Sequence, residues 1–169
     1  MTRFPFILLC AIGVLLTGCV TTDMQGYADR DLPTRPIQRM AAYVVAPTAL
    51  ASSFQSSIAQ EAAKRGVGAE DAYALLPPTR TYTDTEIRKV LAESGVDAVL
   101  IINVGDAGVV KEYAGTFFQA RLVEPATGRN LWVGSGEVSA GGRLFVGNGS
   151  SASSSASAIF DDLSAKKII

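Results

Sequence analysis

The chain has 169 residues, of which 48% are hydrophobic and 18% are charged, and its formal net charge is −1. The near balance of 15 basic and 16 acidic residues offers no electrostatic surface to a nucleic acid, so we expect no such partner. The absence of histidine excludes the commonest general base and the commonest metal ligand. A chain of this length fits one domain, since domains typically hold ~100–150 residues.

Residues 1–19 have the parts of a secretory signal in the expected order. Arg3 supplies a positive charge, and an apolar run follows from Phe4 to Leu16. This run is shorter than the ~20 residues that a membrane-spanning helix needs, and it has the length of a signal-peptide core. We therefore predict export rather than a permanent membrane span.

The run ends in Leu16-Thr17-Gly18-Cys19, which resembles the lipobox of bacterial lipoproteins. The resemblance implies that residues 1–18 are removed and that Cys19 carries the acyl chains, palmitate among them. Two or three such chains hold a protein stably in a bilayer. The alternative is an ordinary signal peptide with an unrelated cysteine. Val20 stands where enterobacterial lipoproteins kept at the inner membrane have Asp, so the resemblance implies the outer membrane and a domain that faces the periplasm.

The two cysteines agree with this interpretation. Cys10 would leave with the signal peptide, and Cys19 would be consumed as a thioether. We therefore expect no disulfide, no thiolate metal site and no cysteine nucleophile in the mature protein.

The mature chain divides into a tether and one domain. Residues 19–39 contain many Thr, Asp, Gly and Pro residues and little apolar periodicity, which predicts a lipidated, flexible spacer. Residues 40–169 predict an α/β domain with a tendency toward α+β. The predicted order is β-α-β-α-β-β-β-α, with about five strands in a single mixed sheet and three helices.

The first part of the domain alternates strands with helices. Ser52 and Gln55 have capping-box spacing, and Thr83 and Glu86 have it again before a second apolar stripe that ends at Gly95. The predicted elements are a strand at residues 40–46, a helix at 53–65, a short strand at 72–76, a helix that begins at 83, and a strand at 98–104. The last of these strands is apolar without alternation until Asn103, which predicts burial on both faces.

The second part predicts a hairpin and a helix. Pro125 and Gly128 mark the loop between strands at residues 113–123 and 130–138. Gly134 and Gly136 alternate with Trp132, a spacing that leaves room for close packing. A third helix is predicted over residues 153–166, although the Gly- and Ser-rich residues 141–158 are compatible with either a loop or a helix.

Two short motifs in this domain resemble those of small periplasmic α/β domains of Gram-negative lipoproteins. The motifs are Ala98-Val99-Leu100 after Asp97, in the central strand, and Thr127-Gly128 followed by Trp132, in the hairpin. The group includes the curli-secretion lipoproteins, the penicillin-binding-protein activator lipoproteins and the amino-terminal domain of TolB. Glu124-Pro125 stands where Asp is usual in those hairpins. The long insertions that build the curli-secretion pore are absent from the sequence, so pore formation is not implied.

The sequence contains no clear catalytic constellation. Paired carboxylates at Glu70-Asp71 and Asp161-Asp162 predict solvated surface rather than an acid/base pair, because adjacent helix positions do not face each other. No phosphate-binding loop is present. A serine–lysine dyad is possible from composition alone, but no Ser-x-x-Lys stands in a strained turn to support it. We therefore expect no catalytic, cofactor-binding or metal-ligating residue and no cofactor.

Three residues are candidates for contact with a partner. Arg80 and Tyr82 lie in a loop that follows a predicted strand, where α/β sheets place ligands, although a rigid connection explains them as well. Trp132 is either a partner anchor or a core residue. The predicted function is a non-enzymatic, membrane-anchored periplasmic lipoprotein that binds an envelope protein. The alternative is a structural subunit of an oligomeric secretion or envelope assembly, and a hydrolase is less favoured.

Overall fold

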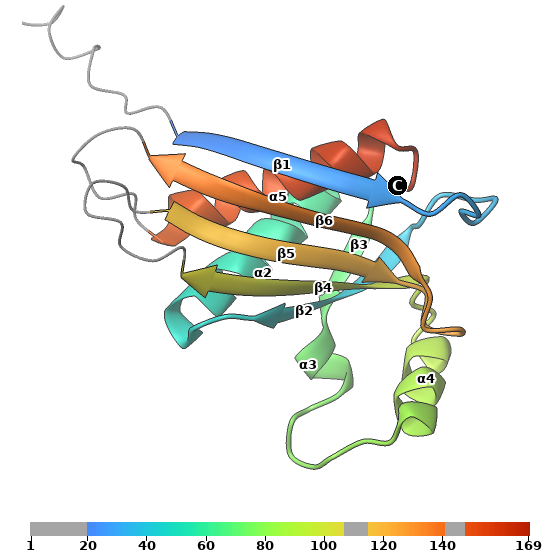
Figure 1. The fold of residues 1–169 in the computed structure, drawn as a ribbon. Helices are drawn as coiled ribbons and strands as arrows, with labels where there is room; N and C mark the ends of the chain where they lie inside the picture. Colours follow the sequence, from blue (N-terminus) through green and yellow to red (C-terminus); the bar gives the residue numbers. More distant parts are fainter. Residues whose placement is uncertain (1–19, 107–114, 141–147) are drawn as a thin grey trace, which may run out of the picture.

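The computed structural model describes residues 20–106, 115–140 and 148–169, which form one six-stranded sheet and four helices (Figure 1). The strand order is β1-β6-β5-β4-β2-β3, parallel at the β4–β2 and β2–β3 pairs and antiparallel elsewhere. The elements are β1 (Val20–Ala28), β2 (Arg39–Val45), α2 (Thr48–Lys64), β3 (Gly68–Asp71), α3 (Ala72–Leu75), α4 (Asp84–Glu93), β4 (Ala98–Asp106), β5 (Gly115–Val123), β6 (Asn130–Ala140) and α5 (Asn148–Ala165). The predicted α/β class and single mixed sheet are confirmed, with one more strand and one more helix than expected.

The additional strand lies where a flexible spacer was predicted. Instead of a tether, residues 20–28 form β1, which pairs antiparallel with β6 from Val20 opposite Ala140 to Ala28 opposite Trp132. The residues of β1 are mostly small or polar, so their sequence carries no clear strand pattern. Pairing with a strand more than a hundred residues away decides their structure, and the prediction of a spacer over all of residues 19–39 was wrong.

The predicted strand at residues 72–76 is also wrong. The strand β3 lies earlier, at Gly68–Asp71, and residues 72–75 form the short helix α3. The side chain of Asp71 accepts a hydrogen bond from the backbone N–H of Tyr73 at 2.9 Å. This N-cap starts the helix directly after the strand, which a reading of the apolar pattern alone could not show.

The helices α2 and α5 both begin before their predicted starts. Helix α2 begins at Thr48 after Pro47, which makes no side-chain cap, so the predicted capping box of Ser52 and Gln55 does not form. Gln55 Nε2 instead donates to the backbone oxygen of Ala42 at 3.1 Å and to Asp71 Oδ1 at 3.0 Å. Helix α5 begins at Asn148 rather than at residue 153, which assigns residues 148–158 to a helix.

Other local predictions are confirmed. Thr83 and Glu86 form the capping box of α4, in which each side chain bonds to the other residue's backbone N–H. Hydrogen bonds from the backbone N–H of Thr83 and from the side chain of Arg80 lower the pKa of Glu86 to about 2. Gly95 has a φ of +65° just after this helix, a conformation that favours glycine.

The main core lies between one face of the sheet and the helices α2 and α5, which cover that face (Figure 1). Alternate residues of each strand point into it. The largest fully buried side chains are Trp132, Phe54, Phe118, Phe160, Met40, Ile58, Leu100, Ile102, Leu122, Leu131, Ile159 and Leu163. This core contains most of the buried hydrophobic residues of the described structure.

Trp132 is a core residue and not a surface anchor. Its side chain is 1% exposed, and its Nε1 donates to Asp162 Oδ2 at 2.7 Å. Gly134 makes room for the ring, because a Cβ at that position would lie 2.5 Å from Trp132 Cζ2. A Cβ at Gly26 would likewise lie 2.7 Å from Trp132 Nε1. The expected close packing at Gly134 is therefore confirmed, and the interpretation of Trp132 as a partner anchor is wrong.

The two adjacent carboxylates of α5 have separate structural roles. Asp161 pairs with Arg65 of the neighbouring helix segment, and Arg65 also pairs with Glu61 at 2.6 Å. Asp162 pairs with Lys166 and accepts the bond from Trp132. Hydrogen bonds from Lys64 and then Arg65 lower the pKa of the buried Glu61. The Arg65–Asp161 pair joins the end of α2 to α5, and Asp161 and Asp162 are each bound to a different partner rather than to each other.

We predict that Gly134→Ala destabilises the protein by ~1–3 kcal/mol, because the new methyl group overlaps the buried indole of Trp132. Gly105→Ala is the matched control, since this strand glycine has no atom within 4 Å of an added Cβ. Chemical denaturation should show a lower midpoint for the first variant and little change for the second. Equal midpoints would contradict this account of the packing.

Candidate functional site

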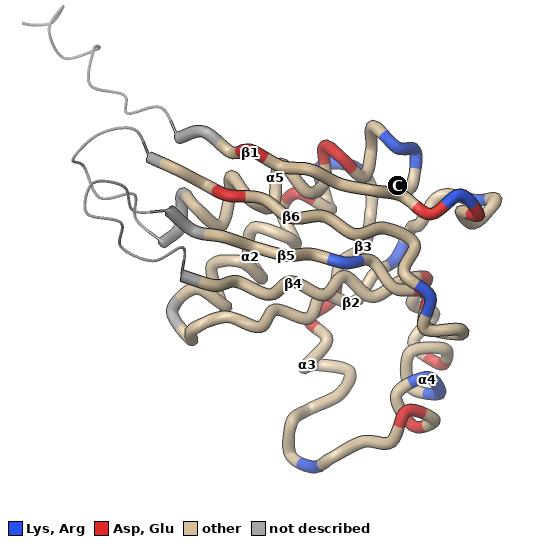
Figure 2. The backbone as a smooth tube through the Cα atoms, in the orientation of Figure 1, with Lys and Arg blue, Asp and Glu red and all other residues tan. Residues whose placement is uncertain are grey.

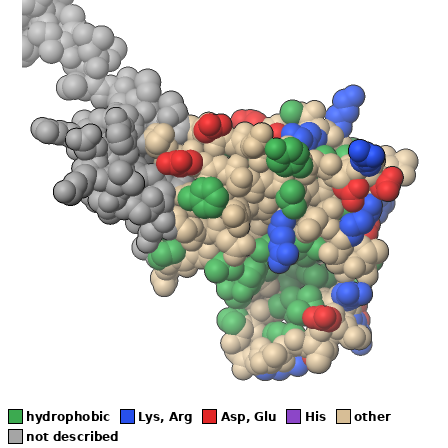
Figure 3. Space-filling model, in the orientation of Figure 1, with side chains coloured by type: hydrophobic (Ala, Val, Ile, Leu, Met, Phe, Trp, Pro, Cys, Tyr) green, Lys and Arg blue, Asp and Glu red, His purple; other side chains and the backbone are tan. Residues whose placement is uncertain are grey.

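The second face of the sheet is only partly covered. Helices α3 and α4 pack over the part formed by β2 and β4, where Ala41, Ala72, Leu91 and Val96 form a smaller buried cluster. Figure 1 shows these helices projecting from one end of the sheet, and Figure 3 shows a hollow with apolar side chains next to them. The strands β1, β6 and β5 have no helix over this face in the described structure.

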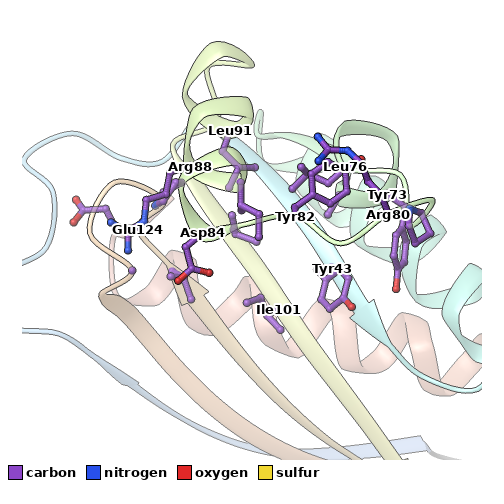
Figure 4. Close-up of a pocket in the computed structure, with 17 residues that line it drawn as sticks. Tyr43, Tyr73, Leu76, Arg80, Tyr82, Asp84, Arg88, Leu91, Ile101 and Glu124 are labelled. Atoms are coloured by element: carbon purple, nitrogen blue, oxygen red, sulfur yellow. The ribbon is translucent and has the colours of Figure 1, made fainter.

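The hollow is a pocket of about 550 Å³ between the sheet, α3, α4 and the β5–β6 loop. Its sides include Tyr43, Tyr73 and Tyr82, and Ile101, Val99 and Leu91 contribute apolar surface (Figure 4). We call it the tyrosine pocket. Its volume lies within the ~300–1,000 Å³ of typical ligand sites.

The tyrosines come from three different segments and are held by contacts with their surroundings. The rings of Tyr43 on β2 and Tyr73 on α3 have centroids 5.2 Å apart and are tilted by 55°. Hydrogen bonding with Tyr43, and then burial, raises the pKa of Tyr73 above its ordinary value. The hydroxyl of Tyr82 donates to the backbone oxygen of Pro77 at 3.0 Å. The pocket is therefore partly pre-formed.

The rim of the pocket carries charges of both signs. Arg80 lies over the ring of Tyr82, 4.2 Å from its centroid, and pairs with Glu86 at 2.8 Å. Arg88 donates to the backbone oxygen of Ala126 in the β5–β6 loop at 3.3 Å. Asp84 and Glu124 are the acidic lining residues. The lining thus has two basic and two acidic residues, and their charges balance. We therefore expect the pocket to recognise a ligand by apolar contact rather than by net charge.

A second, shallower hollow of about 430 Å³ lies on the uncovered half of the same face. Its lining is more polar and includes Gln25, Asn103, Gln119, Arg121 and Ser135. Figure 2 shows that charged residues are sparse along these strands and denser around α4 and the loops. The two halves of the face therefore differ in chemistry, and the apolar, aromatic half is the better candidate site.

The arrangement offers no evident catalytic chemistry. Within residues 20–106, 115–140 and 148–169, no group of three or more His, Cys, Asp or Glu side chains could hold a metal ion. The raised pKa of Tyr73 keeps its hydroxyl protonated, which makes it a poor base at neutral pH. None of the described helices is long and apolar enough to cross a membrane.

The structure places the candidate residues from the sequence as follows. Arg80 and Tyr82 line the tyrosine pocket, and their contact with a partner stays a prediction. The lipobox residues Leu16, Thr17, Gly18 and Cys19 lie outside the described residues. Sequence reasoning missed Tyr43 and Tyr73, because they lie in an apolar strand and in a segment that was predicted as a strand, and only the fold brings them together.

No protein-family model and no curated protein sequence matches the chain. Solved structures do match. A PelC dodecamer from Paraburkholderia phytofirmans has a TM-score of 0.57 at 16% identity, covering 88% of this chain and 99% of that one. Lipoprotein GNA1162 from Neisseria meningitidis has a TM-score of 0.50 at 19% identity, covering 77% and 99%. At these identities the likeness shows that the chain shares their fold.

Proposed function

We propose that the chain is a non-catalytic lipoprotein of the outer membrane whose periplasmic domain binds an apolar segment of another envelope protein in the tyrosine pocket. Residues 1–18 are the signal peptide, and acyl chains on Cys19 supply the anchor. The observation that carries the binding role is the pre-formed, apolar and tyrosine-lined pocket. Tyrosine is enriched among the residues that dominate protein–protein binding energy.

The anchor has support from the sequence and from the position of β1. The lipobox ends one residue before Val20, the first residue of β1. The likeness of the fold to a protein described as a lipoprotein fits this proposal. An acylated Cys19 would adjoin the sheet directly.

The position of the pocket suits a partner that arrives from the periplasm. Val99 and Val123, which line the pocket, pair with each other at the end of the sheet where β4 begins. β1 begins at the opposite end, where Val20 pairs with Ala140. A nine-residue strand spans ~30 Å at ~3.3 Å per residue, so the pocket and the acyl chains of the same copy lie at opposite ends of the sheet.

A second candidate function is a subunit of an oligomeric envelope assembly. The observation that favours it is the likeness to PelC, which crystallised as a dodecamer and 99% of which is covered. The uncovered half of the sheet face supports self-association, since Tyr27 is 60% exposed and Val133 is 39% exposed there. The two functions are compatible, because an assembled subunit can still present its pocket.

The anchor is tested by exchanging the two cysteines separately. We predict that Cys19→Ser abolishes labelling with radioactive palmitate and removes the protein from the outer-membrane fraction, because the thiol that carries the acyl chains is gone. Cys10→Ser is the matched control and should keep both, since residue 10 lies in the removed segment. Undiminished labelling of Cys19→Ser would contradict the proposal.

The pocket is tested by placing a charge inside and outside it on the same strand face. We predict that Ile101→Arg lowers partner capture from envelope extracts at least ~10-fold, because a charge without a partner in an apolar contact costs more than 1.4 kcal/mol. Asn103→Arg, two residues along β4 and outside the pocket, should capture the same protein as the wild type. Equal capture by both variants would contradict the assignment of the pocket as the binding site. Circular dichroism checks that both variants fold.

The assembly is tested by the mass of the intact lipoprotein in a mild detergent. We predict one discrete oligomer by native mass spectrometry, because a subunit that works in an assembly has a closed set of contacts. A monomer at micromolar concentration would contradict the second candidate function and leave the pocket proposal standing.

A further inference from the structure

The two edges of the sheet differ in how well they resist pairing with another strand. Edge strand β3 has four residues, ends in Glu70 and Asp71, and runs straight into α3. The side chain of Gln55 donates to the backbone oxygen of Ala42, which belongs to the last residue pair of β2 with β3. Short, charged and interrupted edges of this kind discourage strand addition.

Edge strand β1 is longer and less charged than β3. It has nine residues, contains no proline or lysine, and pairs with β6 without a shift in register. Asp23 is its one charged residue. A long, regular edge with a single charge is a template for another strand.

The register shows which backbone groups point outward. The backbone N–H of Asp29 donates to the backbone oxygen of Leu131 at 2.8 Å, and this pair continues the β1–β6 register. In an antiparallel pair every second residue directs its backbone groups to the same neighbour, so Tyr27, Gln25 and Asp23 also direct theirs to β6. The alternate residues Thr22, Met24, Gly26 and Ala28 therefore direct theirs away from the sheet. No strand of the described structure lies on that side.

We propose that β1 pairs antiparallel with β1 of a second copy of this chain, with Met24 on the two-fold axis. This register places Met24 opposite Met24 and Thr22 opposite Gly26, so outward-facing backbone groups meet one another along the whole strand. The two copies then share one continuous sheet. The inference rests on the proposed self-assembly, and it adds the surface through which two copies meet.

The exposed side chains of β1 favour this register over its neighbours. Asp23 lies opposite Gln25 of the second copy on both sides of the axis, which pairs a carboxylate acceptor with an amide donor. A slip of two residues in one direction would set Asp23 against Asp23, and like charges directly opposite are unfavourable. A slip in the other direction shortens the overlap and loses the Asp–Gln pairs.

The arrangement has a consequence at the membrane. The two Cys19 residues would leave the shared sheet at opposite ends of the paired strands. Both anchors can enter one leaflet only when the sheet lies along the bilayer, with the two-fold axis along the membrane normal. If the strands instead stood perpendicular to the membrane, one of the two anchors would lie ~30 Å from the surface.

A single cysteine on the axis tests the pairing in the full-length, membrane-extracted lipoprotein. Met24→Cys places two thiols on residues whose Cα atoms are ~5.5 Å apart, within disulfide range. We expect a covalent dimer with an oxidant or a short bismaleimide. Tyr27→Cys is the control: it is more exposed, but its two copies lie six positions apart along the strand, ~20 Å, and should not be linked. Absence of the Met24→Cys dimer, or equal linking of Tyr27→Cys, overturns the proposal.

A second pair of variants tests the backbone bonds without a cross-link. Thr22→Pro removes an outward N–H that β6 does not use, and edge strands tolerate proline at such positions. We expect the native mass to fall to that of a smaller species, whereas Thr22→Val keeps the N–H and the wild-type mass. An unchanged mass in Thr22→Pro overturns the proposal. A wild-type oligomer without a Met24→Cys dimer refutes only this contact, and a wild-type monomer refutes self-assembly as a whole.

Discussion

The structure depends on one constraint, which is that a six-stranded sheet has two faces and the helices of the described residues bury only one of them completely. Helices α2 and α5 cover the first face with a continuous core, and Trp132 is held there by Asp162 and by the missing side chains of Gly26 and Gly134. The short helices α3 and α4 reach only part of the second face. Both the tyrosine pocket and the open half of the sheet follow from this unequal cover.

The same constraint accounts for where the charged groups lie. Arg65 and Asp161 join the end of α2 to α5 beside the main core, and Asp162 holds Trp132 of β6. Arg80 and Glu86 secure the start of α4. The ion pairs thus serve packing and capping. Around the pocket they fix the rim of an apolar surface, which suits recognition of another protein better than it suits proton transfer.

Features that depend on neighbouring residues could be predicted from the sequence, and features that depend on distant pairing could not. The capping box of Thr83 and Glu86 and the strand β4 are local patterns, and both form as expected. The predicted burial of this strand on both faces was wrong, because Val99 and Ile101 line the pocket on the partly covered face. β1 has no comparable pattern, because its pairing partner in β6 lies more than a hundred residues away. The site divides in the same way: Arg80 and Tyr82 belong to one loop, whereas Tyr43 and Tyr73 meet only through the parallel pairing of β2 with β3 and the Asp71 cap of α3.

An anchor on Cys19, as proposed, would be joined to β1 without a spacer. A random-coil tether lets a domain sample many heights and orientations, with a reach that grows as the square root of its length. Here the first described residue, Val20, is already paired with Ala140, so acyl chains on Cys19 would act on the edge of the sheet itself. The bilayer would then restrict the tilt of the whole domain. Each copy would lose orientational freedom once, when it inserts, and not again when it meets another copy. Two anchored copies would consequently meet with their β1 edges already near the membrane plane, which lowers the entropic cost of pairing them.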